Sequence, residues 1–250
     1  MLHVITVHHR SPRWIAVQLD YLARHLHEPY RTYASLEGID PSWHERFDVV
    51  VPTAGKHAGK LNHLARIALR HAEPDDLLLF LDGDAFPIAD PMPSVRAALE
   101  TAALVAVRRD ENLGDVQPHP SFCAVAASTW AAIGGDWSNG ASWVNRSGRE
   151  ISDVGGNLRW QLDDAELTWT PMLRTSDHDL HPVWFGVYGD VVYHHGAGFR
   201  SMISRFDIAE AGGGVLGRVR LRLRARGVRR TSEELFQKIA TDPSFHEQIR

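Results

Sequence analysis

The first half of the chain alternates between short apolar runs and segments in which apolar side chains recur every three or four residues. Apolar runs of about four to eight residues predict strands, and the longer spacing predicts helices. The expected strands cover residues 4–7, 31–36, 48–51, 77–81, 103–107 and 122–126, and the expected helices cover 14–26, 61–71, 94–101 and 129–133. Strands that alternate with helices indicate an α/β fold with a mostly parallel sheet.

The pattern loosens after residue 134, where aromatic residues become more frequent. A helix is expected over 157–167 and a last strand over 187–194. Three glycines at 212–214 then precede an arginine-rich segment, and a short terminal helix is expected over 231–247. We therefore expect one domain over 1–210, with halves of about 1–110 and 111–210, followed by a tail over 211–250.

One apolar run ends in two acids. Five apolar residues, Leu77 to Leu81, lead directly into Asp82-Gly83-Asp84. Gly83 permits a tight turn, and Pro87 is expected to prevent regular pairing from resuming. The two carboxylates thus lie at the carboxyl end of a buried strand, where open α/β sheets bind ligands. They suit Mg²⁺ or Mn²⁺, with a diphosphate supplying further oxygens. The alternative is a solvated turn, which the apolar sequence on both sides disfavours.

Composition narrows the class of protein. With 250 residues and 44% hydrophobic content, the chain can bury the core of one domain. A formal net charge of −4 gives no general attraction to nucleic acid. Cys123 is the only cysteine, which excludes disulfides and thiolate zinc sites within one chain. The sequence has neither the pattern of a secretory signal nor an apolar run of transmembrane length, so we expect a cytoplasmic protein.

Three segments resemble, in order, the motifs of the GT-A nucleotide-sugar glycosyltransferases. Leu81-Asp82-Gly83-Asp84 is similar to the family's DxD motif. Residues 59–64 (Gly-Lys-Leu-Asn-His-Leu) are similar to the segment before it, and His195-Gly196-Ala197-Gly198 matches the late HxxG pattern. The resemblance covers residues 1–200. It implies a GT-A (Rossmann-like) fold with a smaller acceptor-side region, a nucleotide-diphosphate sugar as donor, and Mn²⁺ or Mg²⁺ as cofactor.

The resemblance also assigns roles to residues. Asp84 is expected to bind the metal directly, and Asp82 to bind the ribose or to reach the metal through water. The third ligand is expected to be His195. Its neighbour His194 points to the other side of the strand, and strand direction alone does not decide between the two. The expected nucleotide-sugar contacts are Thr6, His8, Arg10, Lys60, Asp82, Gly83 and Arg200.

Transfer with inversion needs a base beside the acceptor hydroxyl. In the family that the chain resembles, the catalytic carboxylate lies at the start of a helix between the DxD and the late histidine. The resemblance therefore implies Asp153 as the base, although the acidic pair usual in the family is missing there. The alternative role for Asp153 is an N-cap of the helix 157–167. Sugar rings stack on aromatic side chains, so Trp137 and Trp143 are expected acceptor contacts, with His119 on the same side. Each tryptophan has core packing as its alternative.

The arginine-rich residues 215–230 admit three interpretations. The first is a solvated helix packed on the domain, and the second is an edge strand over 219–226. The third is a segment that lies on the cytoplasmic face of an anionic membrane.

The function expected first is a metal-dependent, inverting glycosyltransferase with an unknown acceptor: a glycan, a lipid-linked sugar or a small molecule. A non-catalytic nucleotide-sugar or carbohydrate-binding protein is one alternative. A sugar-phosphate nucleotidyltransferase is another, disfavoured because no glycine-rich phosphate loop follows the first strand.

Overall fold

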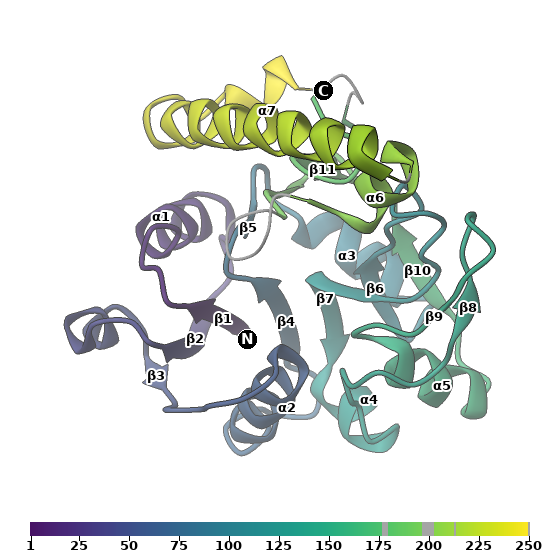
Figure 1. Cartoon of the computed structure of the whole chain (residues 1–250). Helices are drawn as coiled ribbons and strands as arrows, with labels where there is room; N and C mark the ends of the chain where they lie inside the picture. The colour runs from purple at the N-terminus through teal and green to yellow at the C-terminus, as the bar shows by residue number, and fades with distance from the viewer. Residues whose placement is uncertain (177–179, 197–202, 213, 250) are drawn as a thin grey trace.

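The computed structural model describes all residues except 177–179, 197–202, 213 and 250. A sheet of seven strands forms the centre of the molecule (Figure 1). The strand order is β10-β6-β7-β4-β1-β2-β3. All neighbouring strands are parallel except that β7 runs antiparallel to β4 and β6. The predicted mostly parallel α/β sheet is confirmed. The strands are β1 (Leu2–His9), β2 (Tyr30–Glu37), β3 (Val49–Val50), β4 (Leu77–Asp82), β6 (Leu104–Val107), β7 (His119–Ala126) and β10 (Trp169–Met172).

Helices cover both faces of this sheet, because strands buried on both sides need apolar cover on each. The helices are α1 (Ile15–His25), α2 (His57–Ala68), α3 (Met92–Leu99), α4 (Ala127–Ala132) and α5 (Gly156–Asp164). Apolar residues of α2, α4 and α5 pack together on one face, and those of α1 and α3 on the other. A short 3-10 turn, η1 (Pro41–Arg46), precedes β3, and β8 (Trp143–Val144) pairs with β9 (Glu150–Ile151).

A second, three-stranded sheet begins directly after the Asp82-Gly83-Asp84 turn. Its order is β11 (Gly186–Tyr188), β12 (Val192–His194) and β5 (Ala85–Pro87). The expectation that regular pairing does not resume after this turn is therefore wrong. All three residues of β5 pair with β12: Pro87, its last residue, lies opposite Val192, and Ala85 lies opposite His194. This register brings the end of β12 to the acidic turn.

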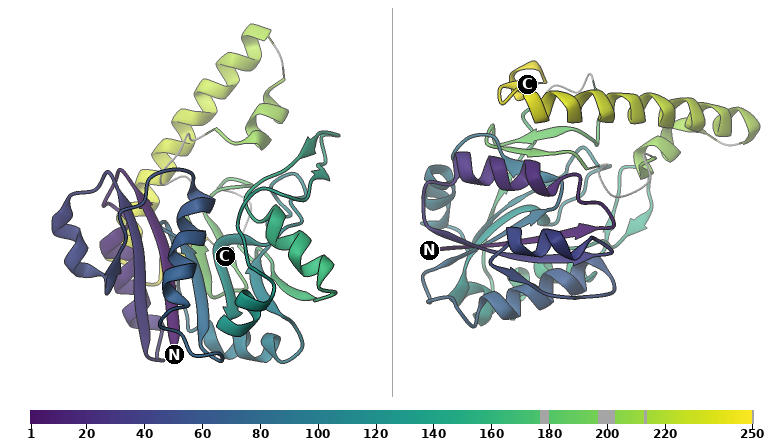
Figure 2. Two further views of the ribbon diagram at one scale, coloured as in Figure 1. Left: turned by 90° about the horizontal axis from the view of Figure 1, so that it is seen from below. Right: turned by 90° about the vertical axis from the view of Figure 1, so that its left-hand side faces the viewer.

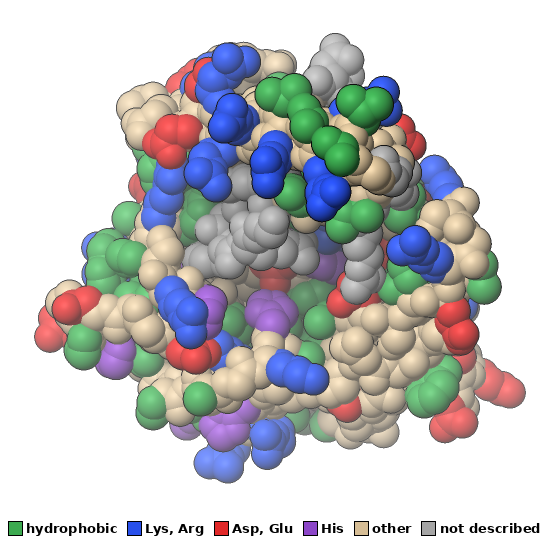
Figure 3. All heavy atoms as spheres, in the orientation of Figure 1, with side chains coloured by type: hydrophobic (Ala, Val, Ile, Leu, Met, Phe, Trp, Pro, Cys, Tyr) green, Lys and Arg blue, Asp and Glu red, His purple; other side chains and the backbone are tan. Residues whose placement is uncertain are grey.

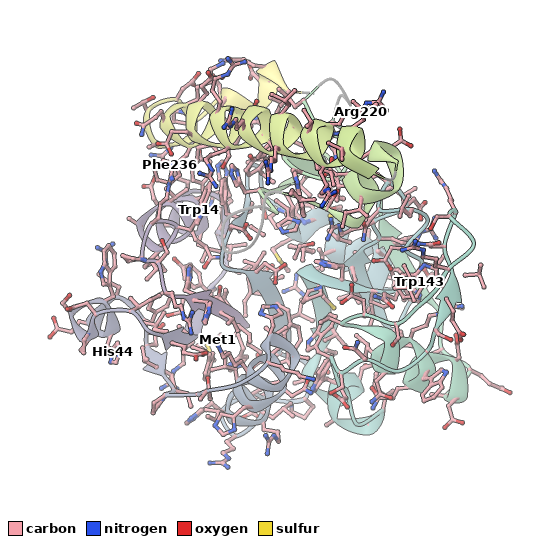
Figure 4. The ribbon with its side chains drawn as sticks, in the orientation of Figure 1. Met1, Trp14, His44, Trp143, Arg220 and Phe236 are labelled. Atoms are coloured by element: carbon pink, nitrogen blue, oxygen red, sulfur yellow. The ribbon has the colours of Figure 1, made fainter. Side chains whose placement is uncertain are left out.

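The last segment forms α6 (Arg205–Ala211), the 28-residue helix α7 (Gly214–Thr241) and a 3-10 turn, η2 (Phe245–Gln248). Residues 219–226 belong to helix α7, so the alternative prediction of an edge strand there is wrong. Its second half packs on the domain, where the rings of Phe236 and Trp14 meet edge-on with their centroids 4.9 Å apart (Figure 4). Phe245 of η2 is buried beside Phe86. Its first half extends past the rest of the domain (Figure 2). No helix in the described part of the chain has the length and apolar character needed to cross a bilayer.

Candidate functional site

The carboxyl ends of the parallel strands border one cavity. Strand β1 lies between β2 and β4, so the chain changes the direction in which it adds strands there, and α/β sheets bind ligands at such points. Strand β6 ends at the same edge, and the antiparallel β7 begins there. The cavity has a volume of about 510 Å³. Its walls include His9, His57, Lys60, Asp82, Gly83, Asp84, Arg109, Asp115, His119, Asp153, Trp184 and His194.

Gln18 of α1 fixes the acidic turn from behind. Its side-chain amide donates to the backbone carbonyls of Asp82 at 2.8 Å and Ala85 at 2.7 Å. Its amide oxygen accepts a hydrogen bond from Thr6 at 3.0 Å and lies 3.1 Å from His8 Nε2. Burial lowers the pKa of His8 to about 4, so that its ring is neutral at pH 7. Thr6 and His8 were expected to contact the donor, but both side chains instead point to Gln18 and support the turn.

Gly83 has no space for a side chain, because a Cβ atom there would lie 2.6 Å from the carbonyl oxygen of Val7 and 2.8 Å from His8 Nδ1. We expect Gly83→Ala to lower the free energy of unfolding by about 1–3 kcal/mol, the usual cost of overpacking. Urea unfolding would measure this. The matched control is Gly59→Ala in α2, where a Cβ atom meets nothing within 4 Å and helix propensity favours alanine. Equal stability changes in the two variants would contradict the close approach at Gly83.

Two carboxylates and one imidazole meet at the turn. Ligand atoms of Asp82, Asp84 and His194 all lie within 4.8 Å of one another, the one such group of three or more His, Cys, Asp or Glu side chains among the described residues. His194 Nε2 is 3.5 Å from Asp82 Oδ2 and 3.6 Å from Asp84 Oδ1. The other oxygen of Asp82 accepts a hydrogen bond from His57 Nε2 at 2.8 Å, which orients the carboxylate. The geometry can hold one divalent cation.

Both acids of this group are ionised at neutral pH. Burial alone would raise the pKa of Asp82, but the hydrogen bond from His57 and the nearby His119 and His194 outweigh it and hold the pKa well below its ordinary value. Burial likewise acts to raise the pKa of Asp84, and the His194 imidazole outweighs it. The turn therefore presents two negative charges to the cavity, as a cation site requires.

The structure brings His194, and not the predicted His195, to the carboxylates. His195 points to the other side of β12, where it is fully buried and its ring centroid lies 4.5 Å from that of Trp14. Both of its ring nitrogens have partners: the Tyr193 hydroxyl at 2.9 Å and the Ser232 hydroxyl of α7 at 2.7 Å. Burial lowers its pKa to about 3. His195 is a core residue that joins α7 to the domain.

The wall on the β1 side contains a buried cation. Lys60 of α2 is almost fully buried, and its ammonium pairs with the Glu37 carboxylate, which also lies 3.5 Å from His9 Nδ1. Of the other expected donor contacts, Arg10 is exposed at the end of β1 and does not line the cavity, and Arg200 lies outside the described residues. On this side of the cavity, the predicted donor contact Lys60 lines the wall, whereas Arg10 does not.

The opposite wall contains residues that sequence reasoning missed. Arg109 and Asp115 follow β6, and each is almost fully buried yet lines the cavity. The Arg109 guanidinium lies over the ring of Trp184, 5.9 Å from its centroid. Burial raises the pKa of Asp115 to about 6; Arg109 opposes this shift and the charge of Asp153 adds to it. The available sequence signal was a charged loop directly after a predicted strand.

Two predicted acceptor-side residues, Asp153 and His119, line the cavity. The alternative role of Asp153 as a helix cap does not fit, because the N-cap of α5 is Gly155, and the Asp153 carboxylate accepts from the Val154 N–H at 2.9 Å. Trp137 is fully buried against Phe80 and belongs to the core. Trp143, in the β8–β9 hairpin, is not part of the cavity wall (Figure 4).

No family model and no curated protein matches the chain. Among solved structures, the glycosyltransferase GlyE of Streptococcus pneumoniae matches with a TM-score of 0.39 and 16% identity over 52% of this chain and 35% of that one, about a third of its length. The mannosyltransferase PcManGT of Pyrobaculum calidifontis, in complex with GDP-Man and Mn²⁺, matches with a TM-score of 0.48 and 13% identity over 96% of this chain and 75% of that one. The galactosyltransferase LgtC matches with a TM-score of 0.35 and 15% identity over 52% and 59%. All three are glycosyltransferases, the class that the motifs resemble. At these scores and identities the similarity fixes neither an activity nor a substrate.

Proposed function

We propose that the chain is a metal-dependent glycosyltransferase that moves a sugar from a nucleotide-diphosphate sugar to an acceptor. The observation that carries this proposal is the Asp82–Asp84–His194 group in a cavity at the carboxyl edge of the sheet, beside the point where strand order reverses. The acceptor stays unidentified, and the cytoplasmic location expected from the sequence stays a proposal.

The donor set of two carboxylates and one imidazole fits a divalent cation. Mg²⁺ prefers oxygen ligands throughout, whereas Mn²⁺ also accepts an imidazole nitrogen, so we propose Mn²⁺ before Mg²⁺. Asp82, Asp84 and His194 would hold the ion, and His57 keeps the Asp82 carboxylate in place. When bound, such an ion neutralises the charge that develops on a leaving diphosphate.

The protein's own groups divide the cavity into two sides. Lys60 and His9 lie on the β1 side, where we propose that the nucleotide binds. Arg109, Asp115 and Asp153 lie on the other side, where we propose that the acceptor binds. There a carboxylate can take the proton of the acceptor hydroxyl, and we assign this role first to Asp153, which is the less buried of the two acids. A base in this position corresponds to transfer with inversion.

A screen of nucleotide sugars tests the proposal. Thermal unfolding is measured with each donor in the presence of Mn²⁺, Mg²⁺ or EDTA, and hydrolysis of each stabilising donor is then followed. We expect metal-dependent stabilisation and slow donor hydrolysis. Stabilisation without any hydrolysis or transfer would favour a binding protein. Release of pyrophosphate from a nucleoside triphosphate and a sugar phosphate would identify a nucleotidyltransferase.

Alanine variants of the two adjacent histidines are expected to differ in the property they lose: Mn²⁺ binding in one and stability in the other. His194→Ala removes a proposed ligand, so we expect it to weaken Mn²⁺ binding about tenfold or more, with little loss of stability. His195→Ala instead leaves a cavity in the core and removes the partner of Ser232, so we expect about 2–5 kcal/mol of lost stability. Calorimetric titration with Mn²⁺ and urea unfolding separate the two effects. Weaker Mn²⁺ binding by His195→Ala alone would restore the register predicted from the sequence.

A further inference from the structure

We propose that the N-terminal part of α7, residues 214–230, is a binding surface for anionic lipid. This segment, named here the α7 arm, extends beyond the domain over most of its length (Figure 2) and packs on the domain at Val228, near its end. Its apolar and basic side chains lie next to one another along the helix (Figure 3). The proposal does not depend on the proposed function, because lipid binding is measured without donor, acceptor or metal.

The arm exposes an apolar stripe to solvent. Val215 is 68% exposed, Leu216 73%, Val219 46% and Leu223 61%. Because each helical residue turns the chain by about 100°, these four side chains fall within one sector of about 100°. The side chains that face the domain, such as Val228 and Leu235, lie on the opposite side of the same helix. The stripe is therefore a second apolar face, which no described part of the chain covers.

Arginines flank this stripe on both sides. By the same helical geometry, Arg218 and Arg222 border one edge, and Arg220 borders the other. All three are exposed (Arg220 is labelled in Figure 4), as are Arg226, Arg229 and Arg230 in the following turns. No acidic residue occurs between positions 211 and 232. Residues 215–230 carry a formal charge of +7, although the whole chain carries −4, so the remainder carries −11.

The remaining arginine of the arm, Arg224, holds the arm in place. Arg224 Nε donates to the buried carboxylate of Asp207 in α6 at 2.7 Å. The same carboxylate lies 3.1 Å from His181 Nε2, and His181 Nδ1 accepts hydrogen bonds from the backbone N–H groups of Val183 and Trp184. Together with the Ser232–His195 contact, these bonds fix which side of α7 faces outward. The apolar stripe and its arginines are thus presented in a set orientation.

An anionic bilayer matches this surface better than a second copy of the chain. A helix with an apolar face between basic side chains lies in the membrane interface, with its apolar residues among the acyl chains and its arginines at the headgroups. A symmetric dimer through the stripe would instead bring arginines of both copies together, which is unfavourable. Anionic lipids are concentrated on the cytoplasmic leaflet, which agrees with the location expected from the sequence.

Vesicle sedimentation tests the proposal with the full-length chain. The vesicles contain either phosphatidylcholine alone or phosphatidylcholine with about 30% phosphatidylserine, at about 0.1 M and about 1 M salt. We expect binding to the anionic vesicles at low salt and little binding to the neutral ones. Each arginine near the surface accounts for about a fivefold change in affinity, so Arg218→Gln with Arg222→Gln should weaken binding about twenty-five-fold.

Two further variants complete the test. Leu216→Gln with Leu223→Gln replaces the two leucines of the apolar stripe and should reduce binding at low salt without changing the charge. Arg66→Gln with Arg70→Gln, two exposed arginines of α2 and the turn after it, is the matched control, because it removes the same charge on the side of the domain away from α7 (Figure 1), and it should bind as the original chain does. Circular dichroism confirms that α7 persists in each variant. Equal vesicle binding by all variants would overturn the proposal. So would a dimer in sedimentation velocity that Leu216→Gln with Leu223→Gln dissociates, because the stripe would then join two copies.

Discussion

Replacement of Asp84 with alanine is expected to reduce sugar transfer by at least about a thousandfold. A metal ion supplies several kcal/mol of charge stabilisation in the transition state, and about 4 kcal/mol corresponds to a thousandfold in rate. Asp84 is buried, ionised and 3.6 Å from His194, so its loss removes one of the three proposed ligands. Transfer is measured with the donor that the thermal screen identifies, over a range of Mn²⁺ concentrations.

The same variant should lose its metal-dependent stabilisation by nucleoside diphosphate. A ligand at about a hundred times its Kd stabilises the folded chain by about 2.7 kcal/mol, and this gain should disappear together with the metal site. The matched control is Asp163→Ala, which removes an exposed carboxylate on α5 and should change neither quantity. If Asp84→Ala kept full Mn²⁺-dependent activity, the acidic turn would not be the metal site.

Local sequence predicted the strand β4 and its acidic turn because both depend on neighbouring residues. An apolar run of this length is typical of a strand buried on both faces, and Gly83 indicates a tight turn. The supporting layer behind the turn was not predictable in the same way. Gln18 lies 64 residues from Asp82 along the chain, and nothing in its surroundings in the sequence indicates that its amide bonds to this turn.

The choice between His194 and His195 depended on long-range pairing. Adjacent residues on a strand face opposite sides, so a shift of one residue exchanges the ligand and the core residue. The register that decides, Ala85 opposite His194, joins segments more than a hundred residues apart. The late HxxG pattern favoured His195, whereas burial against Trp14 and the hydrogen bond to Ser232 place that residue in the core.

The acceptor side illustrates a different limit. Trp137 was expected to contact a sugar, but aromatic residues near a site are also the ones that fill a core, and Trp137 packs on Phe80. The sequence did not predict Arg109 and Asp115 as site residues, because a charged loop is usually solvated. They reach the cavity because β7 runs antiparallel between β4 and β6, so that β6 ends at the same edge as the acidic turn.

The stability of the chain should depend on pH through Asp115. Its pKa is raised from 3.8 to about 6 in the folded state, so the folded chain binds more protons than the unfolded chain between these values. The contribution of Asp115 to the free energy of unfolding should therefore fall as the pH rises from about 4 to about 6, by up to about 3 kcal/mol. His8 and His195, whose pKa values are lowered by burial, contribute in the opposite direction over this range. Urea unfolding isolates this contribution as a difference: the stability of Asp115→Asn relative to the original chain should increase by up to about 3 kcal/mol as the pH rises from about 4 to about 6. The relative stability of Asp163→Asn should stay constant over the same range.

The proposed base is tested by the pair Asp153→Asn and Asp115→Asn. A positioned base contributes about a hundredfold or more to the rate, so we expect Asp153→Asn to cut transfer by at least about that factor. Its donor affinity should hardly change, because asparagine keeps the shape of the side chain and the metal group is untouched. Asp115→Asn should reduce transfer less than tenfold, since this acid is more deeply buried.

If the two losses were exchanged, Asp115 would be the base. Near-normal transfer by both variants, with a retained anomer in the product by NMR, would contradict a protein base and inversion together, because transfer with retention can use the leaving phosphate to accept the proton.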